Sequence, residues 1–311
     1  MTCFVLALVD GREDNTSVAQ TNYSVLQPDS NEVKRFGKVR SAQDACLPKG
    51  ARMTFQLLIA TMHQVDHSMC EQMNLHSDAI IVNQCDRNGA ESFKFRGSDI
   101  QMLSFNERGV GLSRNTALMR ATADIIEFAD DDMIFTDTYQ EDMLREFEAH
   151  PEADVIIFNV RSLNPERPLQ QFTKFGRITR LTALRYGCPR IAVRREKLLY
   201  HTISFSLLFG GGAKYSSGED SLFLQDCLRS GLRVYCSPVR IADVTYETST
   251  WFKGYTDKYF FDKGVLFAML TPWGCKIYAL LTALKFRKPL NETLHILRQL
   301  NRGIAEYRDK K

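Results

Sequence analysis

From Phe55 onward, short apolar runs alternate with segments in which apolar residues recur at helical spacing. The runs predict strands at 55–61, 79–83, 101–105, 124–129 and 155–158. Helical spacing predicts helices at 111–123 and 138–150, the second closed by Pro151. Strands that alternate with helices form mainly parallel sheets whose faces are covered. We therefore expect an α/β fold, with a Rossmann-like, mainly parallel central sheet flanked by helices.

The sequence as a whole divides into three parts. Residues 1–52 are polar and predict a poorly ordered extension or, alternatively, a small accessory element packed on the main domain. Residues 53–255 are the predicted catalytic domain, with an irregular stretch from about 160 to 215. Residues 256–311 predict a helical, basic C-terminal extension. Further elements predicted within this scheme are a strand at 190–194, a helix at 219–230 and a strand at 232–236.

Charge and cysteine usage exclude several classes of protein. The net charge is only +3, so nucleic acid is not an expected partner. The eight cysteines include no pair with CxxC spacing, which argues against a zinc site or a disulfide framework. Free thiols suit a reducing compartment. Because the sequence shows neither a convincing secretion signal nor an apolar run of about 20 residues, we expect a cytoplasmic protein.

Three consecutive carboxylates, Asp130, Asp131 and Asp132, follow the apolar run at 124–129. Grouped carboxylates are costly to bury unless a cation meets them. Ligands of open α/β sheets bind at the carboxyl ends of the strands. Oxygen ligands suit Mg²⁺ or Mn²⁺, which phosphates can share. The alternative for such a triplet is a solvated turn or a helix start.

Two further segments carry groups suited to chemistry. Gly218-Glu219-Asp220 opens a predicted helix, where a carboxylate can take a proton from a hydroxyl or simply stabilise the first helical turn. Gly109 to Asn115 (GVGLSRN) combines two glycines with Arg114 and Asn115, which are suited to a nucleotide or diphosphate. This segment lacks the GxxxxGK[ST] pattern of a Walker loop.

The order of these motifs resembles that of family 2 glycosyltransferases with the GT-A fold, particularly bacterial enzymes of surface polysaccharide assembly. The resemblance covers about residues 54–255. It is carried by the segments LLIAT at 57–61, IVNQCD at 81–86, GLSRN at 111–115, FADDD at 128–132 and GED at 218–220.

The resemblance implies a role for each matching residue. Thr61 should lie by the nucleotide, and Asp86 should contact uracil. Arg114 matches the arginine of the donor-site helix, and we expect it to offset charge on the leaving diphosphate. Of the acidic triplet, Asp132 is the expected metal ligand, with Asp130 as a second ligand nearer the ribose. The full expected donor-binding set is Thr61, Asp86, Arg114, Asp130 and Asp131.

At the acceptor side, the resemblance makes Asp220 the catalytic base, with Glu219 as its alternative. Many relatives supply a late histidine as a further metal ligand, but the sequence has none between His201 and His295. The segment 245–251 occupies that region instead. The expected cofactor, Mn²⁺ or Mg²⁺, would then have fewer protein ligands, and diphosphate and water would complete its shell.

The resemblance implies an inverting, metal-dependent glycosyltransferase. Its donor would be a nucleotide sugar, first of all a UDP-sugar, and its acceptor a saccharide or a lipid-linked saccharide. A nucleotidyltransferase is the first alternative, although no triphosphate loop follows the first strand. A catalytically degenerate, glycosyltransferase-like scaffold is the second, although Asp132 and Asp220 are retained.

The C-terminal segment adds a prediction about location. From Gly274 onward nine basic and three acidic residues give a net charge of +6, and apolar residues precede this charge. Such a segment can lie on an anionic membrane, which would place the protein at the inner face of the cell membrane. The alternative is a core-capping helix with a solvated basic end.

Overall fold

The computed structural model describes residues 52–180, 182–245, 254–286 and 288–309. The predicted N-terminal extension therefore lies almost wholly outside the described residues, and its nature stays a prediction. Residues 52–311 form one compact unit.

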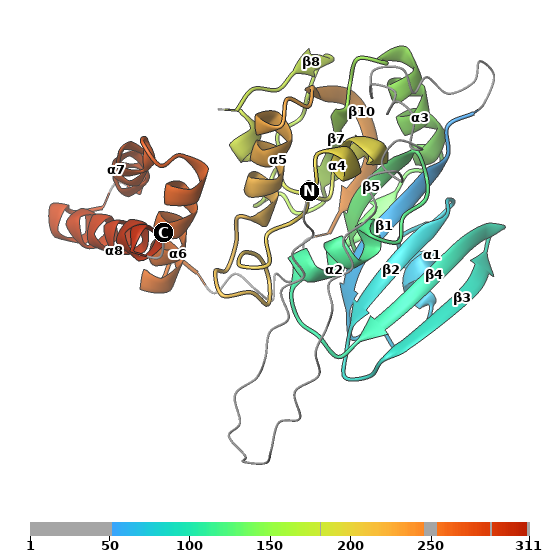
Figure 1. Cartoon of the computed structure of the whole chain (residues 1–311), viewed down its shortest axis with the longest axis horizontal. Coiled ribbons are helices and arrows are strands. Elements are labelled where there is room, and N and C mark those ends of the chain that lie inside the picture. The colour runs from blue at the N-terminus through green and yellow to red at the C-terminus, as the bar shows by residue number, and fades with distance from the viewer. Residues whose placement is uncertain (1–51, 181, 246–253, 287, 310–311) are drawn as a thin grey trace, which may run out of the picture. The chain divides into compact units, whose positions relative to one another are not determined.

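The strands of the described residues belong to one sheet (Figure 1). They are β1 (Phe55–Met62), β2 (Ala79–Gln84), β3 (Gly89–Phe95), β4 (Ser98–Phe105), β5 (Ile125–Asp130), β6 (Met133–Phe135), β7 (Val155–Ser162), β8 (Gly176–Arg177), β9 (Ile191–Arg194) and β10 (Val234–Val244).

The sheet order is β3-β4-β2-β1-β5-β9-β7-β10-β6, with β8 also paired to β10. Strands β4, β2, β1 and β5 run parallel to one another, and β7 runs parallel to β10. Strands β3, β6, β8 and β9 are antiparallel to their neighbours. This mainly parallel sheet with helices on its faces confirms the predicted fold class.

Helices complete the architecture. They are α1 (Ser68–Gln72), α2 (Val110–Leu118), α3 (Tyr139–Ala149), α4 (Arg195–Tyr200), α5 (Glu219–Arg229), α6 (Asp257–Leu270), α7 (Cys275–Lys285) and α8 (Leu290–Arg308). A short 3₁₀ helix spans Ala183–Arg185.

Alternate residues of the central strands belong to two different cores. On one face, Leu57 and Ile59 of β1 pack with residues of α1 and α3, including Tyr139. On the other, Leu58 packs with residues of α2, α4 and α5, including Phe223. Because both faces are buried, these strands read as continuous apolar runs rather than as alternating ones.

The C-terminal helices α6, α7 and α8 (orange to red in Figure 1) have a small core of their own. Two glycines allow α6 and α8 to approach closely, because a Cβ at Gly264 would lie 2.0 Å from the Leu300 carbonyl oxygen and one at Gly303 2.0 Å from that of Phe261. A second cluster joins α6 to α5 and the segment before it, with Val265, Leu266 and Leu270 against Phe209 and Leu222. Among the described helices, none has the length and apolar character that crossing a membrane requires.

Glu127 of β5 is an exception within the core. Its side chain is 0% exposed, and neither carboxyl oxygen has a hydrogen-bond partner among the described residues. Burial raises its pKa well above the ordinary value, and the charge of Arg190 opposes that rise only in part. Burial therefore favours the protonated, neutral form of this side chain in the folded protein.

This state makes folding stability depend on pH at one position. Unfolded Glu127 ionises above about pH 4.3, whereas the folded protein keeps the proton, so ionisation favours the unfolded chain by at most about 1.4 kcal/mol per pH unit. Gln does not titrate. We expect Glu127→Gln to gain stability over the native protein as pH rises from 5 to 7 in urea unfolding. A difference independent of pH would show that Glu127 is ionised in the fold.

Candidate functional site

The carboxyl ends of β1, β2 and β5 lie at the same edge of the sheet, because the three strands are parallel. Ala60 of β1 is in register with Asp130 at the end of β5. This places Thr61 beside the acidic triplet. The buried Thr61 hydroxyl donates a hydrogen bond to Asp131 Oδ2 and accepts one from Gln64 Nε2 at 2.9 Å. Thr61, Asp130 and Asp131, which the sequence predicts to bind the donor, thus lie together at this edge.

Arg114 of α2 joins this edge to the start of α5. Its side chain is only 3% exposed. Nη2 donates to Asp130 Oδ1 at 2.8 Å, and Nη1 donates to Asp220 Oδ1 at 2.9 Å. Nη1 also lies 3.4 Å from Glu219 Oε1. One guanidinium therefore bridges the acidic triplet and both candidate base residues.

This position differs from the one expected for Arg114. The sequence led us to expect a contact with the leaving diphosphate, but both terminal nitrogens are held by carboxylates of the protein. Asn115 is also engaged within the protein, since its side chain donates to the Phe205 carbonyl at 2.9 Å and accepts from the Phe205 N–H at 2.8 Å. Any contact of either residue with the donor stays a prediction.

Small residues allow α2 to reach this position. A Cβ at Gly111 would lie 2.5 Å from the Ser206 carbonyl oxygen, so only glycine permits this packing. Gly210 has a φ of +105°, which favours glycine, and a Cβ there would meet the Glu219 carboxyl at 2.9 Å. The Gly211 carbonyl accepts a hydrogen bond from the Val110 N–H at 2.9 Å. The glycine stretch at 210–212 thus seats the start of α2 beside Glu219.

Burial and neighbouring charge change the proton affinities of this cluster. Burial, followed by the charges of Glu219 and Asp130, raises the pKa of Asp220 to about 7, although Arg114 acts in the opposite direction. Burial alone would favour a neutral Arg114, but Cys188 and the carboxylates outweigh it and raise the pKa of Arg114. The arginine therefore stays charged, and Asp220 is poised to exchange a proton near neutral pH.

Within the described residues, the Asp132 carboxylate accepts a hydrogen bond from its own backbone N–H but forms no ion pair. It is half-buried, and burial together with the charges of Asp130 and Asp131 raises its pKa to about 7. A carboxylate without a cationic partner beside two others is a place where a divalent cation is electrostatically favourable. Within the described ranges, no cluster of three or more His, Cys, Asp or Glu side chains is arranged to hold a metal. A metal at Asp132 would therefore need most of its ligands from diphosphate and water.

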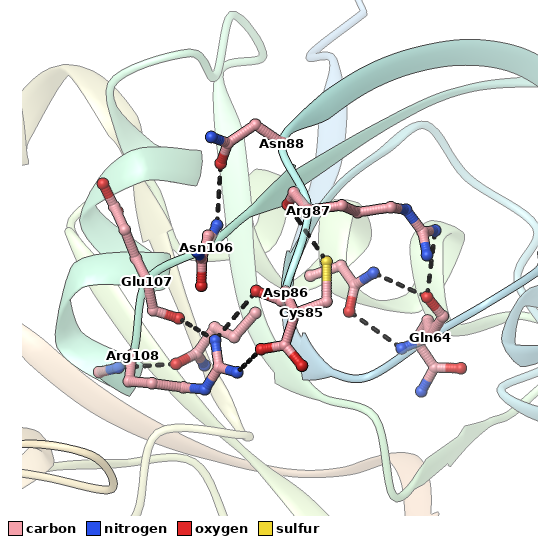
Figure 2. A network of polar contacts seen from close by, with 11 residues as sticks. Gln64, Cys85, Asp86, Arg87, Asn88, Asn106, Glu107 and Arg108 are labelled. Atoms are coloured by element: carbon pink, nitrogen blue, oxygen red, sulfur yellow. Dashed lines mark hydrogen bonds and ion pairs between the residues drawn. The ribbon is translucent and has the colours of Figure 1, made fainter.

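Asp86 lies in a separate polar network at the end of β2 (Figure 2). Its side chain is 83% exposed, and Oδ1 lies 2.5 Å from Arg108 Nη2. Arg108 also donates to the Cys85 carbonyl at 3.0 Å. Through these contacts it ties the end of β2 to the loop that precedes α2. The exposed carboxylate of Asp86 stays accessible to a ligand.

Sequence reasoning missed several side chains that shape this region. Besides Arg108, Gln84 accepts a hydrogen bond from the Gly109 N–H at 2.6 Å, and Asn83 pairs with the Gln64 backbone through both amide atoms. Only their positions in the sequence could have indicated these residues. Arg108 directly precedes the glycine motif, and Asn83 and Gln84 end a buried strand. The segment 246–251, where a late metal ligand was sought, lies outside the described residues.

Comparison with known proteins finds a similar family and a shared fold. The model of glycosyl transferase family 2 matches residues 59–207, which is just under half of the chain. Residues 59–207 are thus similar to a family 2 glycosyltransferase domain. No curated protein matches the chain in sequence.

Solved structures share the fold of this chain. The structure of S. aureus TarS 1–349 with UDP-GlcNAc has a TM-score of 0.53 and 17% identity, with 83% of this chain and 74% of that chain covered. TarS 1–349 with UDP gives a TM-score of 0.55 and 13% identity, with 83% and 92% covered. At these identities the likeness shows the fold alone. Thr61, Asp86, Arg114 and the acidic triplet lie within the family 2 match, whereas Glu219 and Asp220 lie beyond it.

We expect Arg114→Ala to lower the free energy of unfolding by about 3–5 kcal/mol at pH 7, because it leaves grouped, partly buried carboxylates without their cation. Urea unfolding measures this loss. The loss should shrink at pH 5, where protonation of those carboxylates relieves their repulsion.

The matched control is Arg108→Ala, which removes an arginine from a largely exposed ion pair and should cost about 1 kcal/mol or less. Equal costs for the two substitutions would contradict a central role for Arg114 in the site.

Proposed function

We propose that the chain transfers a sugar from a nucleoside diphosphate sugar, with UDP as the first nucleotide to test, to a hydroxyl of a saccharide or lipid-linked saccharide. The reaction is metal-dependent, inverts the anomeric centre and serves surface polysaccharide assembly. The family 2 domain supports glycosyl transfer. The TarS complexes with UDP-GlcNAc and UDP motivate the choice of nucleotide. Metal dependence, inversion and acceptor class come from the motif resemblance.

The observation that carries the proposal is the bridge made by Arg114. It fixes Asp130, which belongs to the acidic triplet, beside Asp220 at the start of α5. A sugar donor held by the triplet through its diphosphate would therefore present its anomeric carbon near a carboxylate able to act as a base. Glycosyl transfer needs this arrangement, because the acceptor hydroxyl must lose its proton while it attacks that carbon.

At the donor end, Asp132 would hold Mn²⁺ or Mg²⁺. Arg114 bonds to Oδ1 of Asp130, so the other carboxylate oxygen of Asp130 would serve as a second metal ligand. A bound divalent cation supplies charge neutralisation for the leaving diphosphate. Thr61 fixes Asp131 by a hydrogen bond, so the triplet has a defined shape before the donor arrives. The exposed Asp86 is the proposed partner of the uracil ring of the donor nucleotide.

At the acceptor end, Asp220 takes the proton of the attacking hydroxyl. Its raised pKa of about 7 brings its proton affinity close to the working pH, where a general base is most effective. Arg114 acts as a positioning residue, since it holds Asp220 in place without a contact to the reacting atoms. Glu219 shares the same guanidinium at longer range and is the alternative base.

The rival functions receive less support. A nucleotidyltransferase needs a loop for a triphosphate, and the family 2 match instead begins within β1. A degenerate scaffold has no need for a half-buried Asp132 without a cationic partner, or for a base with its pKa near 7.

We expect Asp132→Ala to lose metal-dependent nucleotide binding together with transfer, and to keep the fold. The substitution removes the carboxylate available to the metal, which links protein and diphosphate. Isothermal titration with UDP, in the presence and absence of Mn²⁺, measures the effect. The gain in affinity that Mn²⁺ gives the native protein should fall at least about tenfold.

Asp137→Ala is the matched control, because Asp137 is an exposed aspartate that accepts a hydrogen bond from the Asn74 side chain at 2.8 Å. It makes the same change of charge and should bind UDP and Mn²⁺ as the native protein does. Unchanged metal-dependent affinity in Asp132→Ala would remove Asp132 from the metal site.

We expect Asp220→Asn to separate chemistry from donor binding. Asparagine keeps the shape of the side chain but cannot accept the proton, so turnover should fall by about 10²–10⁴-fold. Nucleotide-sugar affinity should change little, because the diphosphate lies at the triplet. In the native protein, turnover should fall as pH drops below about 7, where Asp220 is protonated.

Glu219→Gln serves as the comparison for this base. If Asp220→Asn keeps turnover within a few-fold of the native value and Glu219→Gln abolishes it, Glu219 is the base. If donor affinity collapses with turnover in Asp220→Asn, Asp220 belongs to the donor site and the division of roles is wrong.

A further inference from the structure

Helix α7 presents apolar side chains on the face that points away from its own bundle. Cys275, Ala279 and Ala283 recur every four residues and are buried in the core of α6 to α8. The opposite face carries exposed apolar residues at helical spacing. They are Ile277 (64% exposed), Leu280 (46%), Leu281 (59%) and Leu284 (55%).

Neighbouring residues extend this apolar face beyond α7. Trp273, just before the helix, is 100% exposed, and Leu290 at the start of α8 is 74% exposed. We call these six residues, from Trp273 to Leu290, the α7 surface. Large contiguous apolar faces on a protein mark a contact with a partner or a membrane.

The charge around the α7 surface is mainly positive, and the first acidic residue after it, Glu292, pairs with Lys288 at 3.6 Å. From Lys263 to Asn291 the sequence contains five basic residues and no acidic one. Lys276, Lys285 and Lys288 are exposed beside the apolar residues. Basic residues that flank an apolar face suit an anionic lipid surface, where each contributes about 1 kcal/mol at most to attraction.

We propose that the α7 surface docks the protein onto anionic lipid, with α7 lying in the plane of the membrane interface. The helix has 11 residues, so it is about 16 Å long, which is too short for a hydrocarbon core of about 30 Å. The exposed tryptophan and the lysines are the side chains favoured at that interface. A second copy of the chain fits less well, since pairing two such surfaces would bring their lysines together.

Contacts of α6 connect the α7 surface with the candidate catalytic base. Gly218, which precedes Glu219, lies against Leu266, and a Cβ there would approach Leu266 Cδ1 to 2.6 Å. The Ser216 N–H donates to Asp262 Oδ2 at 2.9 Å. Helix α6 therefore ties the bundle that carries the α7 surface to the start of α5. The inference deepens the proposed function, on which it rests, by placing the acceptor in a membrane that contains anionic lipid.

Flotation of the full chain with lipid vesicles tests this surface. We expect binding to phosphatidylcholine vesicles that contain about one third phosphatidylglycerol to exceed binding to pure phosphatidylcholine at least tenfold. The double variant Trp273→Ser/Leu281→Ser should lose at least about tenfold of the binding to anionic vesicles. Both side chains are exposed, so an unchanged urea midpoint would show that the variant folds.

The matched control is Leu199→Ser/Tyr200→Ser, which removes two exposed apolar side chains from α4 (46% and 69% exposed) and should bind vesicles as the native chain does. No flotation of the native chain, or equal flotation of the α7 variant, overturns the proposal. A dimer that disappears in the α7 variant, without vesicle binding, would assign the surface to a second copy. UDP binding, measured separately without lipid, reports on the proposed function and is expected to be equal in all variants.

Discussion

A charged guanidinium buried among carboxylates is the constraint on which this site depends. Asp130, Glu219 and Asp220 would repel one another in a partly dry environment, and Arg114 would be costly to bury alone. Together they are tolerable, because the terminal nitrogens of Arg114 reach oxygens of all three. The end of β5, helix α2 and the start of α5 are therefore held in one arrangement.

This arrangement depends in turn on backbone that can pass very close to α2. Gly111 lies against the Ser206 carbonyl, and Gly210 lies against the Glu219 carboxyl. Larger residues at these positions would push α2 away and separate Arg114 from Asp220. Gly111, which belongs to the predicted nucleotide-binding segment, thus serves the packing of the protein itself.

The parallel core of the sheet was predictable from the sequence, because β1, β2 and β5 are buried on both faces and so read as apolar runs. Strand β3 was missed because it is a largely exposed edge strand, whose polar residues give no such run. Helix α2 ends at Leu118 rather than at 123, and the exposed Met119 follows it, so apolar spacing alone extended the helix too far.

The site was predictable only as a set of motifs. The acidic triplet and Glu219-Asp220 carry their chemistry in their residue types, and strand ends place the triplet at the edge of the sheet. The partners of Arg114 were not predictable, because they lie 16, 105 and 106 positions away in the chain. A pairing over that distance is set by packing of the whole domain, to which periodicity and spacing give no access.

The most direct test is a crystal structure of the protein with UDP and Mn²⁺, read from the anomalous signal of manganese. We expect that signal between the Asp132 carboxylate and the diphosphate, with Arg114 still bonded to Asp130 and Asp220. Manganese bound away from Asp132, or an Arg114 that has left both carboxylates to hold the diphosphate, would contradict the arrangement proposed here.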